Sequence, residues 1–294
     1  MEKKVIAILA VAVILVAGVC TYMIVGNDDD GDDSTTGGAH AVSLDGIEPN
    51  DKNVLDGTYS IARNLILCTK GEPSGNTACF LDWIMSPEGQ EILSTEFVPL
   101  TESQMVSDPA EPSGSSTIKV GGSTSISPIM GELAKAYHEK YPGITITIVS
   151  NGSGPGAKGA VDGTYDIGMC SRDLKESEVA QGLVPHSIGK DGVAVIVNIA
   201  GVDSLTTEQV AKIYSGEITN WNEVGGPDKK IAVYSREDGS GTRDCFDSAM
   251  KHTVEGWKIK AEIATYNNTG GIIGAVQSND GSIGYISIGH LARL

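Results

Sequence analysis

Short apolar runs of strand length recur along residues 41–294, and they alternate with segments of helical periodicity. The runs are rich in Val, Ile and Thr, as in ITITIVS and VAVIVN, and turns rich in glycine and serine bound them. Such runs predict β-strands at residues 64–70, 117–120, 144–150, 166–171, 193–198, 231–236 and 282–287.

Helical segments lie between these predicted strands. Pro128 occupies a first helical position, and apolar residues follow at helical spacing until Pro142. A capping box opens a second helix at Thr206, and Pro87 opens a third. Residues 101–116 contain Pro, Ser and Gly without periodicity, so we expect a linker there. The alternation of strands and helices predicts an α/β fold with largely parallel sheets.

The longest apolar run lies at the N-terminus. Lys3 and Lys4 precede the nearly unbroken apolar residues 5–25, and an aspartate-rich stretch at 28–33 follows them. At 1.5 Å per residue the run is roughly 31 Å long, which is enough to cross a bilayer core. The charges on its two sides predict that residues 1–26 form a single-pass membrane anchor, with the remaining chain outside the cytoplasm.

Two other interpretations of this segment stay open, namely a cleaved signal peptide and a lipoprotein signal that ends at Cys20. Val19 is bulky for a cleavage site, and the apolar run continues past Cys20, so both features favour a retained anchor. Residues 27–40 are polar, acidic and glycine-rich, and they predict a flexible tether.

The composition narrows the classes of function. The chain has 21 Lys+Arg against 38 Asp+Glu, a formal net charge of −17, which argues against a general nucleic-acid binder. Any anionic ligand must therefore be held by local geometry, because the long-range field repels it. The five cysteines form no C-x-x-C pair and the five histidines form no H-x-x-x-H, so the sequence predicts no metal site.

Three glycine- and hydroxyl-rich turns share one context, because each follows a predicted strand and precedes a helical segment. They are GGSTS at 121–125, NGSGPG at 151–156 and REDGSGT at 236–242. A helix N-terminus exposes unpaired N–H groups, glycine lets the backbone approach a ligand, and Ser or Thr adds donors. Converging turns of this kind would form an anion site; the alternative is ordinary loop chemistry in each turn.

The charged contact of such a site is predicted at Arg236, with Arg172 and Arg243 as alternatives. Residues 154–159 fit G-x-G-x-x-G, but the proline within them and the lack of a second nucleotide-binding half argue against a dinucleotide site. The sequence has no G-x-x-x-x-G-K-[ST] and no G-x-S-x-G, and no histidine lies near the glycine-flanked serines. The sequence therefore contains no P-loop, and these features argue against Ser-His-Asp catalysis.

The turns and their surroundings resemble the phosphate-binding subunits of phosphate ABC transporters, the PstS family of type II periplasmic binding proteins. The matching segments are GGSTSISP (121–128), SNGSGPGAKGAVDGTYDIGMCSRDL (150–174), GVAVIVN (192–198), LTTEQVAKIYSGEITNWNEVGG (205–226), SREDGSGTR (235–243) and GSIGYISIGHL (281–291). They cover most of 117–294, and residues 41–103 match as well. The resemblance implies two α/β lobes joined by hinge strands, with a ligand cleft between the lobes.

The order of the matching segments is unusual. In the family, the segment that resembles 41–103 follows the GSIGYISIGHL strand, whereas here it comes first. This order resembles a circular permutation, with 104–116 joining the usual termini; the alternative is a swapped dimer. The permuted arrangement implies a first lobe of 41–190 with a return strand at 281–294, and a second lobe of 191–280.

The resemblance also implies a ligand set. Arg236 would make the charged contact, braced by Asp238. The other expected phosphate-binding residues are Thr124, Ser125, Ser153, Ser171, Arg172, Ser240, Gly241 and Thr242.

One of these positions departs from the family pattern. In well-known relatives an aspartate after the D-x-G-x-x strand accepts the proton of phosphate, and the equivalent residue here is Ser171. A serine hydroxyl can accept a hydrogen bond, but it does not repel an unprotonated anion. The resemblance therefore implies phosphate without implying rejection of sulfate.

The sequence thus predicts an extracytoplasmic receptor that captures inorganic phosphate non-covalently and delivers it to an ABC transporter permease, with no cofactor and no catalytic step. Alternatives are a receptor for sulfate or another tetrahedral oxyanion, and an anion-responsive sensor or scaffold. A phosphatase is disfavoured, because the sequence shows neither a metal cluster nor a nucleophile–base pair. The spacing of Cys68 and Cys79 leaves their pairing open.

Overall fold

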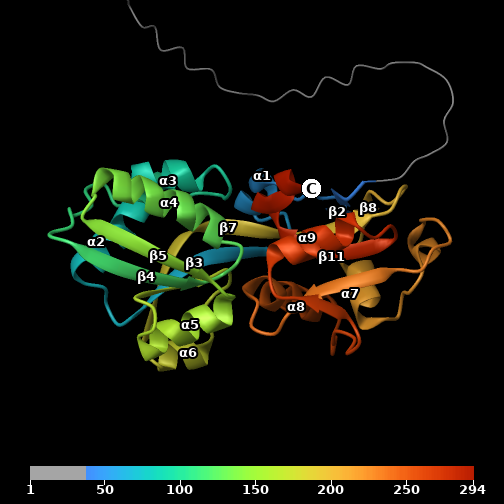
Figure 1. The fold of residues 1–294 in the computed structure, drawn as a ribbon. Helices are drawn as coiled ribbons and strands as arrows, with labels where there is room; N and C mark the ends of the chain where they lie inside the picture. The colour runs from blue at the N-terminus through green and yellow to red at the C-terminus, as the bar shows by residue number, and fades with distance from the viewer. Residues whose placement is uncertain (1–37) are drawn as a thin grey trace, which may run out of the picture. The chain divides into compact units, whose positions relative to one another are not determined.

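Strand β7 (Leu183–Asn198), 16 residues long, is the strand that both halves of the sheet share in the computed structural model, which describes residues 38–294 (Figure 1). Its first part pairs with β3 (Ala62–Lys70), and its second part pairs with β11 (Ser282–Ser287). The resulting nine-stranded sheet has the order β10-β9-β11-β7-β3-β6-β4-β5, and β1 (His40–Ala41) also pairs with β7.

The remaining elements follow the strand–helix alternation that the sequence predicts. In chain order they are β2 (Ser43–Leu44), α1 (Asp51–Leu55), α2 (Gly75–Ile84), α3 (Pro87–Leu93), β4 (Ser116–Gly122), α4 (Ser127–Lys140), β5 (Ile144–Ser150), α5 (Ser153–Asp162), β6 (Ile167–Cys170), α6 (Glu176–Ala180), β8 (Ser204–Leu205), α7 (Thr207–Ser215), β9 (Ala232–Arg236), α8 (Gly241–Thr253), β10 (Ala264–Tyr266) and α9 (Thr269–Gln277), with 3-10 turns at Glu102–Gln104, Trp221–Val224 and Ile288–Arg293.

Two hydrophobic cores define two lobes. We define lobe I as residues 62–190. Its core contains Trp83 and Tyr137, which pack in one cluster with apolar residues of the strands β4, β5 and β6. The core of lobe II, residues 38–61 and 191–294, contains Tyr214, Phe246 and Tyr285, whose rings pack against one another. In Figure 1, α3 and α4 cover one face of the lobe I strands, and α5 and α6 cover the other.

These lobes differ in their boundaries from the sequence expectation, which placed 41–61 and 281–294 in the first lobe. Strand β11 pairs along the second part of β7 and beside β9, so its side chains enter the core of lobe II. Val42 and Leu44 pack in the same core, because β2 pairs with β8 of lobe II.

The sheet is also mixed, where the sequence predicted largely parallel pairing. The pairs β4–β5, β4–β6, β9–β10 and β9–β11 are parallel, as strand–helix–strand units require. The pairs β3–β7, β3–β6 and β7–β11 are antiparallel. All of the antiparallel pairs involve β3 or β7, the two strands that join one half of the sheet to the other.

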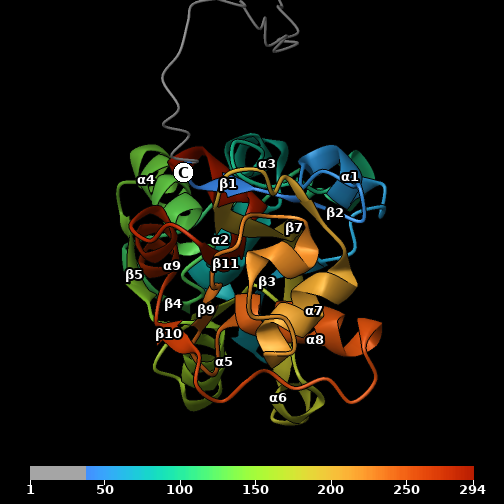
Figure 2. The same cartoon turned by 90° about the vertical axis from the view of Figure 1, so that its right-hand side faces the viewer.

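The segment before residue 104 folds onto the rest of the same chain. Strand β3 fills the position between β7 and β6, and Arg63 to Lys70 pair in register with Asp191 to Leu183 apart from one irregularity after Leu65. Ala41 and Leu294 pack against the same apolar cluster. Figure 2 shows the C-terminus beside β1.

The predicted anchor at 1–26 and most of the tether at 27–40 lie outside the described residues. Within 38–294, none of the helices combines the length and the apolar character needed to cross a membrane. In the same part of the chain Cys68 and Cys79 are free thiols.

Helix α5 lies unusually close to the sheet because it is built from small residues. A Cβ atom at Gly156 would lie 2.6 Å from the Cα of Gly122 and 2.8 Å from the carbonyl oxygen of Gly121. Gly122 itself has φ 139°, a conformation that glycine adopts readily. This contact fixes the N-terminal turn of α5 against the end of β4, where two of the three glycine-rich turns lie.

We predict that Gly156→Ala lowers the free energy of unfolding by about 2 kcal/mol, because the backbone atoms around it cannot move aside. The matched control is Gly131→Ala in α4, whose added Cβ meets nothing within 4 Å. This control should be neutral, or should raise stability by up to about 1 kcal/mol through helix propensity. Urea denaturation of the two variants measures both effects, and equal midpoints would contradict the close packing.

Candidate anion-binding site

The three glycine-rich turns lie together between the two lobes. The amide of Gly154, in the second turn, donates to the carbonyl of Gly239 in the third at 2.8 Å. The hydroxyls of Ser125 in the first turn and Thr242 in the third lie 3.1 Å apart. The first two turns belong to lobe I and the third to lobe II, so these contacts join the lobes.

The hydroxyl groups of these turns are withdrawn from solvent. Ser125, Ser153, Ser171 and Ser240 are each 1% exposed, and Thr242 is 2% exposed. Buried hydroxyls need hydrogen-bond partners, and the contacts among these hydroxyls provide some of them. We call Thr124, Ser125, Ser153, Ser171, Ser240 and Thr242 the hydroxyl cluster.

Helix starts supply part of the geometry. Ser240 caps α8, and its Oγ accepts a hydrogen bond from the Arg243 amide at 3.3 Å. Ser153 is the first residue of α5, and its Oγ accepts from the Ser171 amide at 3.1 Å. A Cβ atom at Gly241 would lie 2.3 Å from the Oγ of Ser153, so only glycine lets α8 begin this close to lobe I.

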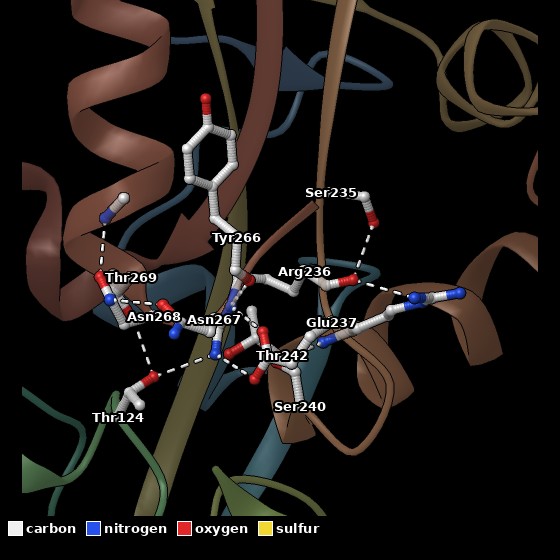
Figure 3. Close-up of polar contacts among 12 residues, drawn as sticks. Thr124, Ser235, Arg236, Glu237, Ser240, Thr242, Tyr266, Asn267, Asn268 and Thr269 are labelled. Carbon is white, nitrogen blue, oxygen red and sulfur yellow. Dashed lines mark hydrogen bonds and ion pairs between the residues drawn. The ribbon is translucent and has the colours of Figure 1, made fainter. Parts of the chain in front are cut away.

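Arg236 reaches from the end of β9 into the cluster (Figure 3). Its Nη2 donates to the Oγ1 of Thr124 at 3.1 Å across the lobes. The carboxylate of Glu237 accepts from Nε and Nη2 at 2.9 and 3.0 Å, and the carbonyl of Tyr266 accepts from Nε at 3.2 Å. Contacts within lobe II therefore fix the guanidinium, and its Nη2 donates across to lobe I.

The brace expected at Asp238 is absent from these contacts. Asp238 occupies the tip of the turn with a side chain that is 96% exposed, and it pairs with Arg243 at 3.0 Å. Glu237, next to Arg236 in the chain, takes its place because it lies before the turn rather than at its tip. The alternative cation Arg243 is engaged by Asp238 and by Asp247 at 3.5 Å.

Arg172, which the resemblance places in the ligand set, forms ion pairs here rather than contacts with the hydroxyl cluster. Its Nη2 lies 2.7 Å from the carboxylate of Glu178, and its Nε lies 2.9 Å from that of Asp244. Burial alone would raise the pKa of Glu178, but hydrogen bonds from Arg172 and from the Lys175 amide outweigh it and lower that pKa. Arg172 therefore serves an ion-pair network that links α6 to α8.

Besides Glu237, sequence reasoning missed three residues of this region. Arg63 and Asp191 form a buried ion pair on β3 and β7, and Arg63 contacts the hydroxyl cluster. Arg63 lies within a strand-forming run without a turn motif, and Asp191, although Gly192 follows it, lies outside the three turns, so the sequence gives no signal that the two residues pair. Thr269 places its Oγ1 3.4 Å from that of Thr124. Its turn, NNTGG at 267–271, has the same strand–turn–helix context as the other three and was recognisable on that ground.

A polar site enclosed by two α/β lobes, with two shared strands connecting them, defines the class of two-lobed binding proteins. The chain belongs to the PBP superfamily, because the model of the PBP superfamily domain matches residues 107–294.

Curated relatives carry a more specific description. The chain is 32% identical over 186 residues to the phosphate-binding protein PstS 2 of Streptococcus agalactiae, and 32% identical over 184 residues to PstS of Bacillus subtilis. These alignments cover 62% of this chain in both cases and 62% and 60% of the relatives. The chain therefore matches less than two thirds of the length of these relatives.

Two solved structures show the same fold. One, from Clostridium perfringens, is described as a phosphate ABC transporter substrate-binding protein with bound phosphate; it is 42% identical, with a TM-score of 0.55 over 58% of this chain and 70% of that one. The other is a phosphate-binding protein of a phosphate ABC transporter from Streptococcus pneumoniae, 31% identical, with a TM-score of 0.53 over 63% and 72%.

The assignment of Arg172 to an ion-pair network gives a stability prediction. Arg172→Gln should lower the free energy of unfolding at pH 7 by about 2 kcal/mol, because Glu178 loses its partner in a largely buried setting. The lowered pKa of Glu178 means that its contribution is present above pH 4.5 and is lost as pH falls through the folded-state pKa.

The difference between Arg172→Gln and the unmodified protein should therefore shrink in acid. Lys158→Gln is the control, because Lys158 is 83% exposed and its pair with Asp162 is worth under about 0.5 kcal/mol. Urea denaturation between pH 3 and pH 7 measures these effects. A pH-independent difference would contradict the pairing with Glu178.

Proposed function

We propose that this protein binds inorganic phosphate non-covalently between its lobes and delivers it to the permease of an ABC transporter. The observation that carries this proposal is the convergence of three helix-start turns, with their buried hydroxyls and Arg236, at one place between the lobes. The names of the PstS relatives, and the phosphate in the C. perfringens structure, support phosphate as the anion.

The proposed ligand set keeps the residues that lie together and omits Arg172 and Asp238. Neutral hydroxyls and backbone amides at helix starts provide most of the donors, and Arg236 provides the charged contact. Such a site binds an anion without breaking a bond, so the proposal includes neither a catalytic step nor a cofactor. The proposed phosphate-binding residues are Thr124, Ser125, Ser153, Ser171, Arg236, Ser240, Gly241 and Thr242.

A receptor for a wider range of tetrahedral oxyanions is the second candidate, and Ser171 favours it. This residue lies in the hydroxyl cluster, with its Oγ 3.4 Å from that of Ser153. The carboxylate nearest to the charged contact, that of Glu237, is engaged by Arg236. A serine at this position and an engaged Glu237 leave neither residue as a free carboxylate that would repel sulfate.

The segment order supports a circularly permuted chain as part of the proposal. Residues 41–103 resemble the part of the family that normally follows the last strand, and β3 within them completes the sheet between β7 and β6. Ala41 and Leu294 pack against one cluster, so the two ends that would be continuous in the family's order lie close together here. The linker at 104–116 would replace the family's usual termini.

The proposed location is the outer face of the cell membrane. The apolar run at 5–25, preceded by Lys3 and Lys4 and followed by aspartates, supports a single-pass anchor with the binding lobes outside the cytoplasm. The partners in this arrangement are inorganic phosphate, the permease subunits and the membrane, and nucleic acid has no part in it.

Calorimetric titration of the purified full-length protein with phosphate tests the proposal. Phosphate should bind, and Arg236→Gln should weaken binding about 10- to 100-fold, because it removes a charge-assisted donor. Lys158→Gln removes the same charge from an exposed site and should leave the affinity unchanged. A protein that unfolds cooperatively yet binds no phosphate would contradict the proposal.

Sulfate titrated under the same conditions separates the two candidate functions. Phosphate binding without sulfate binding supports a phosphate receptor, and shows that Ser171 is compatible with discrimination. Comparable affinities for the two anions would assign the protein to the wider class of oxyanion receptors.

A further inference from the structure

Arg63 lies on β3, one of the two strands that join the lobes, rather than in a turn. It is directly opposite Asp191 in the β3–β7 ladder, and both side chains are almost fully buried, at 2% and 1% exposure. Its Nε and Nη2 donate to the same Asp191 oxygen at 2.9 and 2.6 Å. This pairing compensates the charge and fixes the plane of the guanidinium.

The other side of the guanidinium faces the hydroxyl cluster. Nη1 donates to the Oγ1 of Thr242 at 2.9 Å and to the carbonyl of Ser171 at 3.1 Å. Nη2 also lies 3.4 Å from the Oγ of Ser125. A single side chain thus bonds to lobe I through Ser125 and Ser171, and to lobe II through Thr242.

The chemistry of these contacts sets the direction of the hydroxyls. A guanidinium has only donors, so a hydroxyl bonded to it must accept there. The O–H groups of Ser125 and Thr242 therefore point away from the guanidinium, and in this structure one of the two donates to the other hydroxyl at 3.1 Å. An oxyanion presents acceptors, so both O–H groups can donate to it once this mutual bond is given up, while both oxygens keep accepting from Arg63.

Other hydroxyls of the cluster also accept a hydrogen bond from a group that can only donate. The Oγ1 of Thr124 accepts from Arg236, the Oγ of Ser240 from the Arg243 amide, and the Oγ of Ser153 from the Ser171 amide. Each of these donors is unable to accept in return. Arg63 is distinctive because it orients two hydroxyls, one from each lobe.

We propose that Arg63 is a positioning residue for anion binding: held by Asp191, it directs the O–H groups of Ser125 and Thr242 toward the ligand and so couples the lobes around it. This inference rests on the proposed oxyanion-binding function and adds a residue outside the three turns. It also gives β3, which precedes all three turns in the chain, a direct part in the site.

A double-mutant cycle with phosphate titration tests this role. Arg63→Lys keeps the positive charge beside Asp191 but loses the planar fork that reaches both hydroxyls. We expect Arg63→Lys to weaken phosphate binding about 10-fold in the otherwise unmodified protein. In a Thr242→Val background the same change should weaken binding less than about threefold, because its main target is gone. Equal effects in both backgrounds would overturn positioning through Thr242.

A second variant separates binding from folding. Arg63→Met combined with Asp191→Leu removes both buried charges together, a replacement that buried ion pairs often tolerate. This double variant should unfold cooperatively in urea and bind phosphate at least about 10-fold more weakly than the unmodified protein. Unchanged affinity would overturn the role of Arg63 and leave the proposed function intact. Absence of phosphate binding by the unmodified protein would overturn both the proposed function and this inference.

Discussion

Polar groups buried between two apolar cores must hydrogen bond, and this constraint governs the arrangement of the whole site. Hydroxyls that are 1–2% exposed cannot rely on solvent, and each one left without a partner would cost about 1–3 kcal/mol. Some partners lie in the same lobe, as between Ser153 and Ser171, and others lie in the opposite lobe, as between Ser125 and Thr242 or Arg236 and Thr124. The same bonds therefore bring the lobes together and orient the donors.

The charge of the chain makes this local organisation necessary. A formal net charge of −17 repels an anion at long range, and both buried guanidiniums of the site are paired with carboxylates, Arg63 with Asp191 and Arg236 with Glu237. Net positive charge therefore contributes little to the attraction of an anion to this region. Most of that attraction would come from O–H and N–H dipoles that point into a desolvated space, where electrostatic interactions are strong because water is excluded.

Local sequence patterns predicted the elements and the three turns well. The seven expected strands coincide or overlap with observed ones, and the strand–glycine–helix signature led to residues that meet between the lobes. Other features depend on three-dimensional contacts that local patterns do not carry. Strand β11 pairs with the second part of β7, which places 281–294 in lobe II as we define it, and Arg172 is engaged by Glu178 of α6 and Asp244 of α8.

Arg63 is a residue that local sequence patterns did not indicate at all. Its importance comes from its register opposite Asp191 and its closeness to Thr242, which is 179 residues away in the chain. Neither relation leaves a mark in the neighbouring sequence. Glu237 was likewise missed because the resemblance indicated Asp238, and only the turn geometry shows which carboxylate faces the guanidinium.

A crystal structure of the protein grown with phosphate would show directly whether these groups bind the anion. We expect one phosphate between the lobes, with its oxygens accepting from the hydroxyls of Ser125 and Thr242 and from the guanidinium of Arg236. A phosphate bound elsewhere, with these three side chains still hydrogen bonded only to protein, would contradict this expectation.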